Sequence, residues 1–113
     1  IDAEGAEAAV AAGMQRLVRD NPDVIVMAEL GPSHLQRVGM AVEDWLGAFG
    51  RLGLYDAWRI DELEPLVTQF TAGDASTFYS ANILLARPGN ERMRRLPRRN
   101  GDDPASGKNG NSN

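Results

Sequence analysis

The sequence contains no cysteine, and His34 is the only histidine among its 113 residues. Without cysteine the chain has neither a disulfide framework nor a thiolate zinc site. No stretch approaches the roughly 20 consecutive apolar residues of a membrane-spanning helix, so we expect no membrane partner. No secretory signal peptide is recognisable, which makes a cytoplasmic protein the default expectation. Because the chain starts at Ile1 rather than at methionine, we expect it to be a piece of a longer polypeptide.

Charge is distributed unevenly along the chain. Residues 1–86 carry five basic and thirteen acidic side chains, a net charge of −8, whereas residues 87–113 carry seven basic and three acidic ones, a net charge of +4. An acidic body is poorly suited to a phosphate backbone, so we expect no nucleic-acid partner. The arginines of residues 92–99 have no interleaved aromatic residue that would stack on bases, which favours a solubilising role over contact with RNA, DNA or an anionic membrane.

The composition changes near residue 88. From there Gly, Asn, Asp, Ser and Arg dominate, and such a segment buries too little apolar surface to offset the entropy lost on ordering. The sequence therefore predicts a domain over residues 1–87 and a disordered basic and polar tail over residues 88–113. In the alternative interpretation, Met93 and Leu96 pack on the body as a short terminal helix.

Apolar residues at helical spacing predict the helices. A first helix is expected from about residue 6 until Asn21-Pro22, since the residue before proline avoids the helical conformation, and one of its faces carries Val10, Met14, Leu17 and Val18. A short helix is expected at residues 33–36, with Ser33 in a capping box. A longer helix is expected over residues 42–52, with Gly53 as its terminator and an apolar stripe of Val42, Trp45, Leu46, Phe49 and Leu52.

Three apolar runs predict strands. Residues 24–28 form a continuous β-branched run, which is typical of a parallel strand covered on both faces, and Glu29 is expected to end it. Residues 54–60 and 80–87 are the other two strands, and the polar residues 61–78 between them are expected to be irregular. Strands that alternate with helices indicate an α/β fold.

The opening of the chain resembles a family signature. Residues 1–7 read Ile-Asp-Ala-Glu-Gly-Ala-Glu, and this resembles the Ile-Asp-x-Glu-Gly-x-Glu signature of the FkbM family of S-adenosylmethionine-dependent methyltransferases. The agreement extends over residues 1 to about 87, through Gly13-Met14, Asn21-Pro22-Asp23, the apolar run before Glu29, Gly53 and the closing Ser80-Ala81-Asn82-Ile83-Leu84-Leu85-Ala86-Arg87.

The resemblance implies the carboxyl-terminal half of a Rossmann-like class I methyltransferase domain. Such a domain has a seven-stranded, mostly parallel sheet in a three-layer α/β/α arrangement, and this chain would supply the fifth, sixth and seventh strands. No apolar run is followed by the Gly-x-Gly loop that cradles the donor in such enzymes. We therefore expect an upstream half of the same domain to bind most of the S-adenosylmethionine, and we expect this chain alone to be inactive.

The resemblance also implies the activity, which is O-methylation of a hydroxyl on a sugar or natural product. The alternative is a non-catalytic α/β interaction module that has lost the donor site. Ligands of open α/β sheets bind outside the carboxyl ends of the strands, where Asp2 and Glu29 are expected. Asp2 is the candidate base for the acceptor hydroxyl, or it orients the acceptor or holds a divalent cation together with Glu4. Glu4 and Glu29 are candidates for hydrogen bonds to a sugar or polyol.

Each of these residues also has a purely structural interpretation. Acidic residues ahead of a helix are stabilised by its positive end by roughly 0.3–1 kcal/mol without any catalytic role. By the same reasoning Glu7 is an ordinary first-turn acid. His34 is a candidate general base, although a surface histidine is the favoured interpretation. Trp45 and Phe49 share a helical stripe and are expected to pack in the core.

Overall fold

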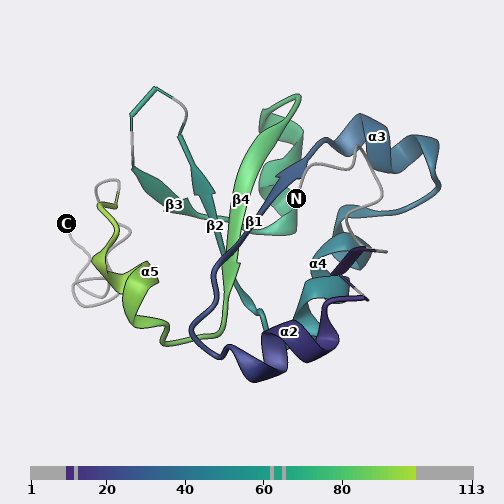
Figure 1. Cartoon of the computed structure of the whole chain (residues 1–113). Coiled ribbons are helices and arrows are strands. Elements are labelled where there is room, and N and C mark those ends of the chain that lie inside the picture. The colour runs from purple at the N-terminus through teal and green to yellow at the C-terminus, as the bar shows by residue number, and fades with distance from the viewer. Residues whose placement is uncertain (1–9, 12, 62, 65, 99–113) are drawn as a thin grey trace.

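A four-stranded antiparallel sheet organises the chain, which a computed structural model describes for residues 10–11, 13–61, 63–64 and 66–98 (Figure 1). Helices and strands alternate over most of this length, so the α/β class is confirmed. The elements in chain order are α2 (Gln15–Asp20), β1 (Val26–Leu30), α3 (Pro32–Arg37), α4 (Val42–Gly50), β2 (Asp56–Ile60), β3 (Val67–Gln69), the 3₁₀ helix η1 (Ala72–Thr77), β4 (Ala81–Ala86) and α5 (Glu91–Arg95).

The strands lie in the order β1-β4-β2-β3, and every neighbouring pair is antiparallel. The prediction that residues 24–28 pair as a parallel strand is therefore wrong. The connection through β3 and η1 returns the chain to the edge at which β2 ends. β4 therefore starts at that edge and runs antiparallel to β2, and it lies between β1 and β2. Because both of these strands are antiparallel to β4, they run in the same direction as each other.

The strand boundaries differ from the predicted ones in an informative way. β1 covers Val26–Leu30, and Glu29 lies within it rather than ending it, because pairing with β4 continues to Leu30 opposite Ala81. β2 and β4 lie within the predicted runs. β3 and η1 fall in residues 61–78, for which the sequence predicted no regular structure, since β3 has only three residues and η1 is largely polar.

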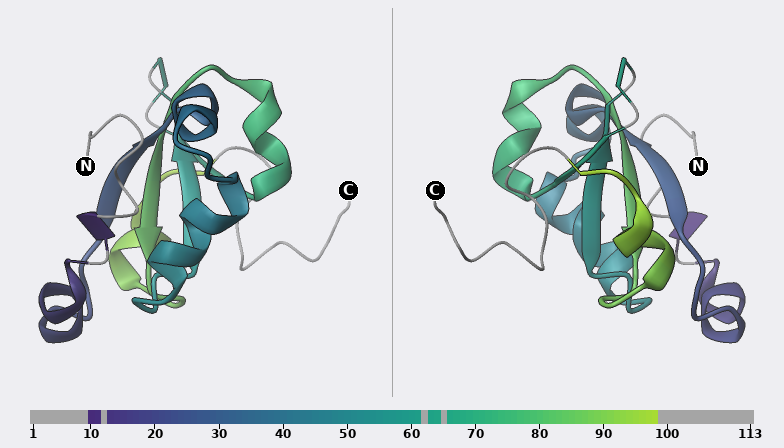
Figure 2. Two further views of the ribbon diagram at one scale, coloured as in Figure 1. Left: turned by 90° about the vertical axis from the view of Figure 1, so that its right-hand side faces the viewer. Right: turned by 90° about the vertical axis from the view of Figure 1, so that its left-hand side faces the viewer.

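One face of the sheet packs against α4, and we call it the α4 face. Trp45 and Phe49 are fully buried there with ring centroids 4.9 Å apart, which confirms their predicted place in the core. They belong to one apolar cluster with alternate sheet residues, namely Val26, Ala28, Leu30, Ala57, Ala81, Ile83 and Leu85. The left view of Figure 2 places α4 in front of the sheet.

The helix ends follow from the local sequence, with one correction. Gly53 has a positive φ of 88°, and the amide of Leu54 donates to the Phe49 carbonyl at 3.1 Å, which confirms a glycine-dependent stop after α4. The capping box predicted at Ser33 is wrong. Gly31 is the N-cap of α3 and Pro32 takes the first helical position, where a missing amide hydrogen costs nothing.

The first helix was predicted to run without interruption from about residue 6 to residue 20, but α2 begins only at Gln15. A turn at Gly13 and Met14 precedes α2, and Val18 is the only buried residue of α2. Leu17 stays 53% exposed, so the predicted apolar face is only partly covered. Residues 6–9 lie outside the described residues.

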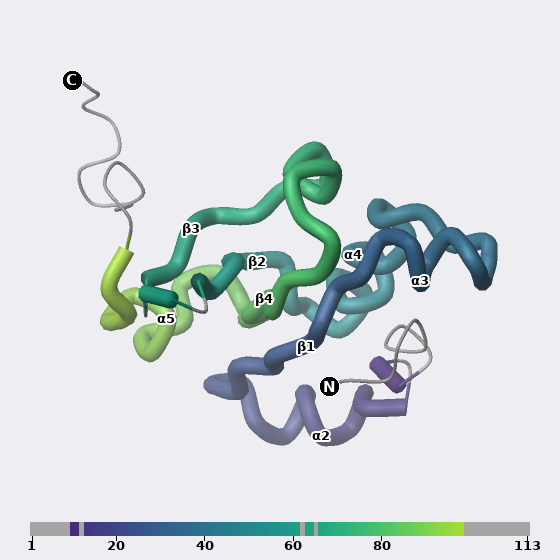
Figure 3. The backbone as a smooth tube through the Cα atoms, turned by 90° about the horizontal axis from the view of Figure 1, so that it is seen from above, coloured from purple at the N-terminus to yellow at the C-terminus, as the bar shows by residue number. Residues whose placement is uncertain are grey.

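The opposite face of the sheet packs against α5, and we call it the α5 face. Met93 of α5 is 1% exposed and belongs to a second apolar cluster with Trp58, Val67, Leu84 and Ala86. Figures 2 and 3 show α4 and α5 on opposite sides of the sheet. The prediction of a disordered tail over residues 88–113 is thus wrong for residues 88–98, and the alternative of a short terminal helix is confirmed. Residues 99–113 lie outside the described residues.

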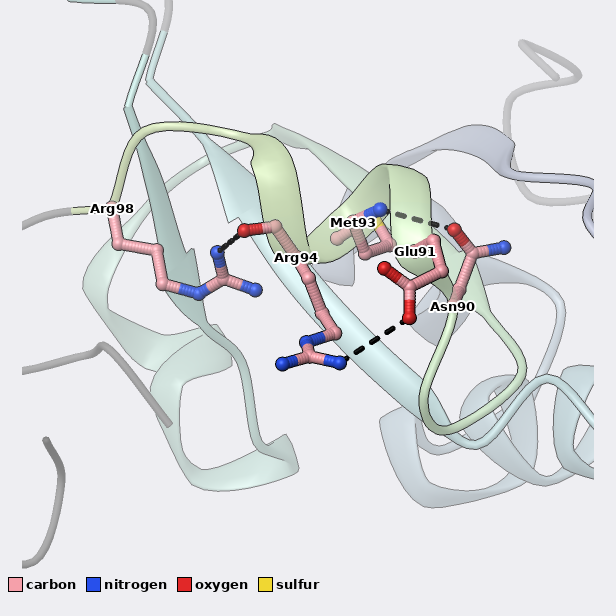
Figure 4. A network of polar contacts seen from close by, with 5 residues as sticks. All are labelled: Asn90, Glu91, Met93, Arg94 and Arg98. Atoms are coloured by element: carbon pink, nitrogen blue, oxygen red, sulfur yellow. Dashed lines mark hydrogen bonds and ion pairs between the residues drawn. The ribbon is translucent and has the colours of Figure 1, made fainter. Parts of the chain in front are cut away.

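Polar contacts hold α5 in place (Figure 4). The Asn90 side chain accepts a hydrogen bond from the Met93 amide at 3.0 Å and donates to the Asp23 carbonyl at 3.0 Å. Farther on, the Arg98 guanidinium lies 4.6 Å from the Trp58 ring centroid, and Nη1 donates to the carbonyl of Arg94 at 2.9 Å. The Asn90 cap and the Arg98 stack therefore fix both ends of this segment, a pattern that average composition does not reveal.

We expect Met93→Ala to lower the free energy of unfolding by about 2–5 kcal/mol, because it empties a fully buried position on the α5 face. Urea unfolding of the whole chain measures this change. The matched control is Arg95→Ala on the same helix, where an exposed side chain changes the free energy by less than about 0.5 kcal/mol. Equal stability of the two variants would show that α5 contributes nothing to the fold.

Candidate functional site

The carboxyl ends of β1 and β2 lie at the same edge of the sheet, on either side of β4. The two strands run in the same direction, and β4 begins between their ends with Ala81 opposite Leu30 and Asn82 opposite Ile60. In open α/β sheets, ligands bind outside this kind of edge. The carboxyl edge, which includes Glu29 and the residues that follow Ile60, is therefore the candidate site of this sheet.

Of the three candidate site residues from the sequence, the structure describes one. Asp2 and Glu4 lie outside the described residues. Glu29 is half-buried in β1, and its Cα partner across the strands is Asn82 of β4. Alternation along β1 puts Glu29 on the α5 face, since Ala28 and Leu30 belong to the core of the α4 face.

Two hollows open at this edge. The first, which we call the edge hollow, has a volume of about 200 Å³ and is lined by Arg59, Ile60, Asp61, Leu63, Ser80, Ala81 and Asn82. The second, which we call the η1 hollow, has a volume of about 270 Å³ and is lined by Arg59, Asp61, Thr68, Gln69, Phe70, Asp74 and Thr77. Arg59 and Asp61 line both hollows, so the two spaces adjoin at the carboxyl end of β2.

Arg59 is the residue that sequence reasoning missed. Its half-buried guanidinium carbon lies 5.0 Å from the centroid of the Phe78 ring, whose own centroid is 6.0 Å from that of Phe70. Among the described residues, this guanidinium forms no ion pair and no hydrogen bond within the protein. In the sequence Arg59 is a charged residue near the end of the predicted strand 54–60. Glu29 was singled out because it is a charged residue at the end of the apolar run 24–28.

The carboxylates near Arg59 take part in local turns. Asp61 Oδ1 accepts hydrogen bonds from the amides of Leu63 at 2.8 Å and Glu64 at 3.4 Å, and so shapes the turn after β2. Asp74 Oδ2 accepts from the amide of Thr71 at 2.9 Å and from its hydroxyl at 3.1 Å, which caps η1. Both aspartates are thereby fixed in position as walls of the η1 hollow.

His34 lies on α3, just after the carboxyl end of β1. A Cβ atom on Gly31 would lie 3.0 Å from His34 Nδ1, so the imidazole folds back over the end of the strand. Its ring centroid is 6.2 Å from that of Tyr79, at an interplanar angle of 81°. His34 is half-buried beside Tyr79 and lines neither of the two hollows.

Within the described ranges no group of three or more His, Asp or Glu side chains is arranged to hold a metal ion. No helix in these ranges has the length and apolar content to cross a bilayer.

No protein-family model matches the chain, and no curated protein and no solved structure matches it.

We expect Tyr79→Ala to change the chemical shift of the His34 imidazole, because the two rings are in edge-to-face contact. Since His34 is the only histidine, its proton signals can be assigned in a one-dimensional NMR spectrum of the whole chain. Tyr55→Ala, which removes the other, equally exposed tyrosine, is the control and leaves the signals in place. An unchanged imidazole shift in Tyr79→Ala would mean that the contact is absent in solution.

Proposed function

We propose that this chain is the acceptor-binding half of an S-adenosylmethionine-dependent O-methyltransferase of the FkbM type. The observation that carries the proposal is the meeting of two co-directional strands, β1 and β2, at one edge with two polar hollows. That edge is where an α/β enzyme presents its substrate. The resemblance of residues 1–7 to the family signature supplies the reaction class.

In this proposal the donor belongs to the upstream half of the domain. The hollows of about 200 and 270 Å³ are smaller than the roughly 300–1,000 Å³ typical of sites for drug-sized ligands. β1 leads into α3 through Gly31 and Pro32, and β2 into a turn closed by Asp61, so neither strand precedes a glycine-rich loop. In this proposal the part of the described residues is to bind the acceptor, and the upstream half binds S-adenosylmethionine.

The acceptor would lie across the carboxyl edge. Asn82 lines the edge hollow, and its cross-strand partner Glu29 lies on the same face of the sheet. In the proposed mechanism Glu29 and Asn82 orient the acceptor hydroxyl by hydrogen bonding. Asp2 then removes its proton as a general base, which makes the oxygen a better nucleophile toward the methyl group that the donor supplies.

The non-catalytic interaction module is the second candidate. The observation in its favour is that the sequence has no Gly-x-Gly loop. The two functions differ in what the longer polypeptide does. An enzyme transfers methyl groups to a hydroxyl acceptor, whereas a module binds its partner without S-adenosylmethionine.

Calorimetric titration with S-adenosylmethionine tests the proposed division of the domain. We expect no heat of binding from this chain, and we expect binding from a polypeptide that carries the upstream half as well. Transfer of a radiolabelled methyl group to a sugar or natural-product hydroxyl by the longer polypeptide would then establish the activity. Micromolar binding by this chain alone would overturn the assignment of the donor to the upstream half. A longer polypeptide that binds no donor would favour the interaction module.

In that longer polypeptide, we expect Asp2→Asn to lower the rate of methyl transfer by about 10²–10⁴-fold, because a general base is lost while the shape of the side chain is kept. Donor affinity should stay unchanged, as measured by the same titration. The control is Glu7→Gln, which alters an acid expected to serve only the helix end. Equal rates for Asp2→Asn and the parent protein would leave only the helix-end role for Asp2.

A further inference from the structure

We infer that the η1 hollow binds a neutral polyhydroxylated ring, such as one sugar unit, through Arg59, Gln69 and Asp74. The inference deepens the proposed function and rests on it in one respect: the bound ring is taken to be part of the methyl acceptor. The binding itself follows from the walls of the hollow, whatever reaction takes place beside it.

The walls offer both donors and acceptors that the protein leaves unused. Arg59 has only donors, and among the described residues none of them is in a hydrogen bond. The Gln69 amide carries two donor hydrogens and an acceptor oxygen, again without a partner in that part of the chain. Asp74 uses Oδ2 to cap η1, and among the described residues its other carboxylate oxygen, Oδ1, is left as an acceptor.

This mixture selects the class of ligand by its charge. An anion requires donors only, and it would be repelled by the carboxylates of Asp61 and Asp74 in the same walls. A cation is attracted by the same two carboxylates, but it cannot accept hydrogen bonds from Arg59, and the Arg59 guanidinium repels it. A hydroxyl both donates and accepts, so adjacent hydroxyls on one ring can use Arg59 and Asp74 together.

The size and the remaining walls fit a single ring. A volume of about 270 Å³ lies just below the range of sites for drug-sized ligands, which run from roughly 300 Å³ upward. Phe70 adds apolar surface to an otherwise polar wall, as the C–H face of a sugar requires. Because Arg59 and Asp61 also line the edge hollow, a ring held here can extend a further hydroxyl toward Asn82.

The experiment is an NMR titration of the whole chain with three methyl glycosides that share one ring: neutral methyl glucoside, its uronate and its 2-amino derivative. We expect the neutral glycoside to bind most tightly, with the shift changes confined to residues of the η1 hollow. Tighter binding of the uronate or of the amino sugar would overturn the inference, and so would the absence of saturable binding by all three.

Two substitutions and a control assign the binding to the hollow. Arg59→Gln should weaken the affinity for methyl glucoside at least about tenfold, since hydrogen bonds to a charged group are lost. Gln69→Ala, at an exposed position of β3, should weaken it several-fold while the unfolding midpoint stays constant, which keeps the test valid if Arg59→Gln folds poorly. Arg51→Gln, an exposed arginine outside both hollows, should bind as the parent does. Parental affinity in Gln69→Ala and in a folded Arg59→Gln would overturn the inference.

The result also separates this inference from the proposed function. Binding to the chain alone needs no methyl donor, so glycoside binding without methyl transfer by the longer polypeptide would remove only the methyltransferase proposal. Methyl transfer to a sugar that is unaffected by Arg59→Gln would remove only the assignment of the acceptor to the η1 hollow.

Discussion

The pairing of β4 with both β1 and β2 is the constraint on which the remaining structure depends. Among the strands of the described residues, β4 alone has a neighbour on each side that is paired over five residues, and its side chains alternate between two cores. Ile83 and Leu85 pack on the α4 face, and Leu84 and Ala86 on the α5 face. The register of this one strand therefore sets which residues of β1 and β2 meet each layer of helices, and it brings Asn82 between Glu29 and Ile60 at the carboxyl edge.

Local sequence predicted the helices and the long strands because their signals are local. The stripe of Trp45 and Phe49, the stop at Gly53 and the apolar run of β4 each depend on residues within a few positions of one another. Strand direction is not local: residues 24–28 read as a parallel strand, but the pairing was decided by how β3 and η1 return the chain. Residues 88–98 were predicted to be disordered for a similar reason, since a single apolar residue such as Met93 gains its importance from an apolar surface some distance away in the sequence.

Part of the candidate site was likewise predicted from local sequence, and part of it depends on distant residues. Glu29 was found because a carboxylate at the end of an apolar run is visible in the sequence, and the structure adds its neighbour Asn82. The η1 hollow was not found, because it is assembled from β2, β3 and η1, two of which were predicted to be irregular. Arg59 became notable only when its surroundings were known: an aromatic ring lies beside its guanidinium, which forms no ion pair or hydrogen bond among the described residues.

The bond from Asn90 to the Asp23 carbonyl joins residues 67 positions apart, and this has a consequence for the order of folding. Because closing so long a loop costs entropy, we expect α5 to dock after β4 has paired with β1 and β2. Interactions that form after the transition state govern the unfolding rate and leave the folding rate nearly constant. We therefore expect the contacts of Asn90, Met93 and Arg98 to set the unfolding rate. The pairing of β4 should set the folding rate.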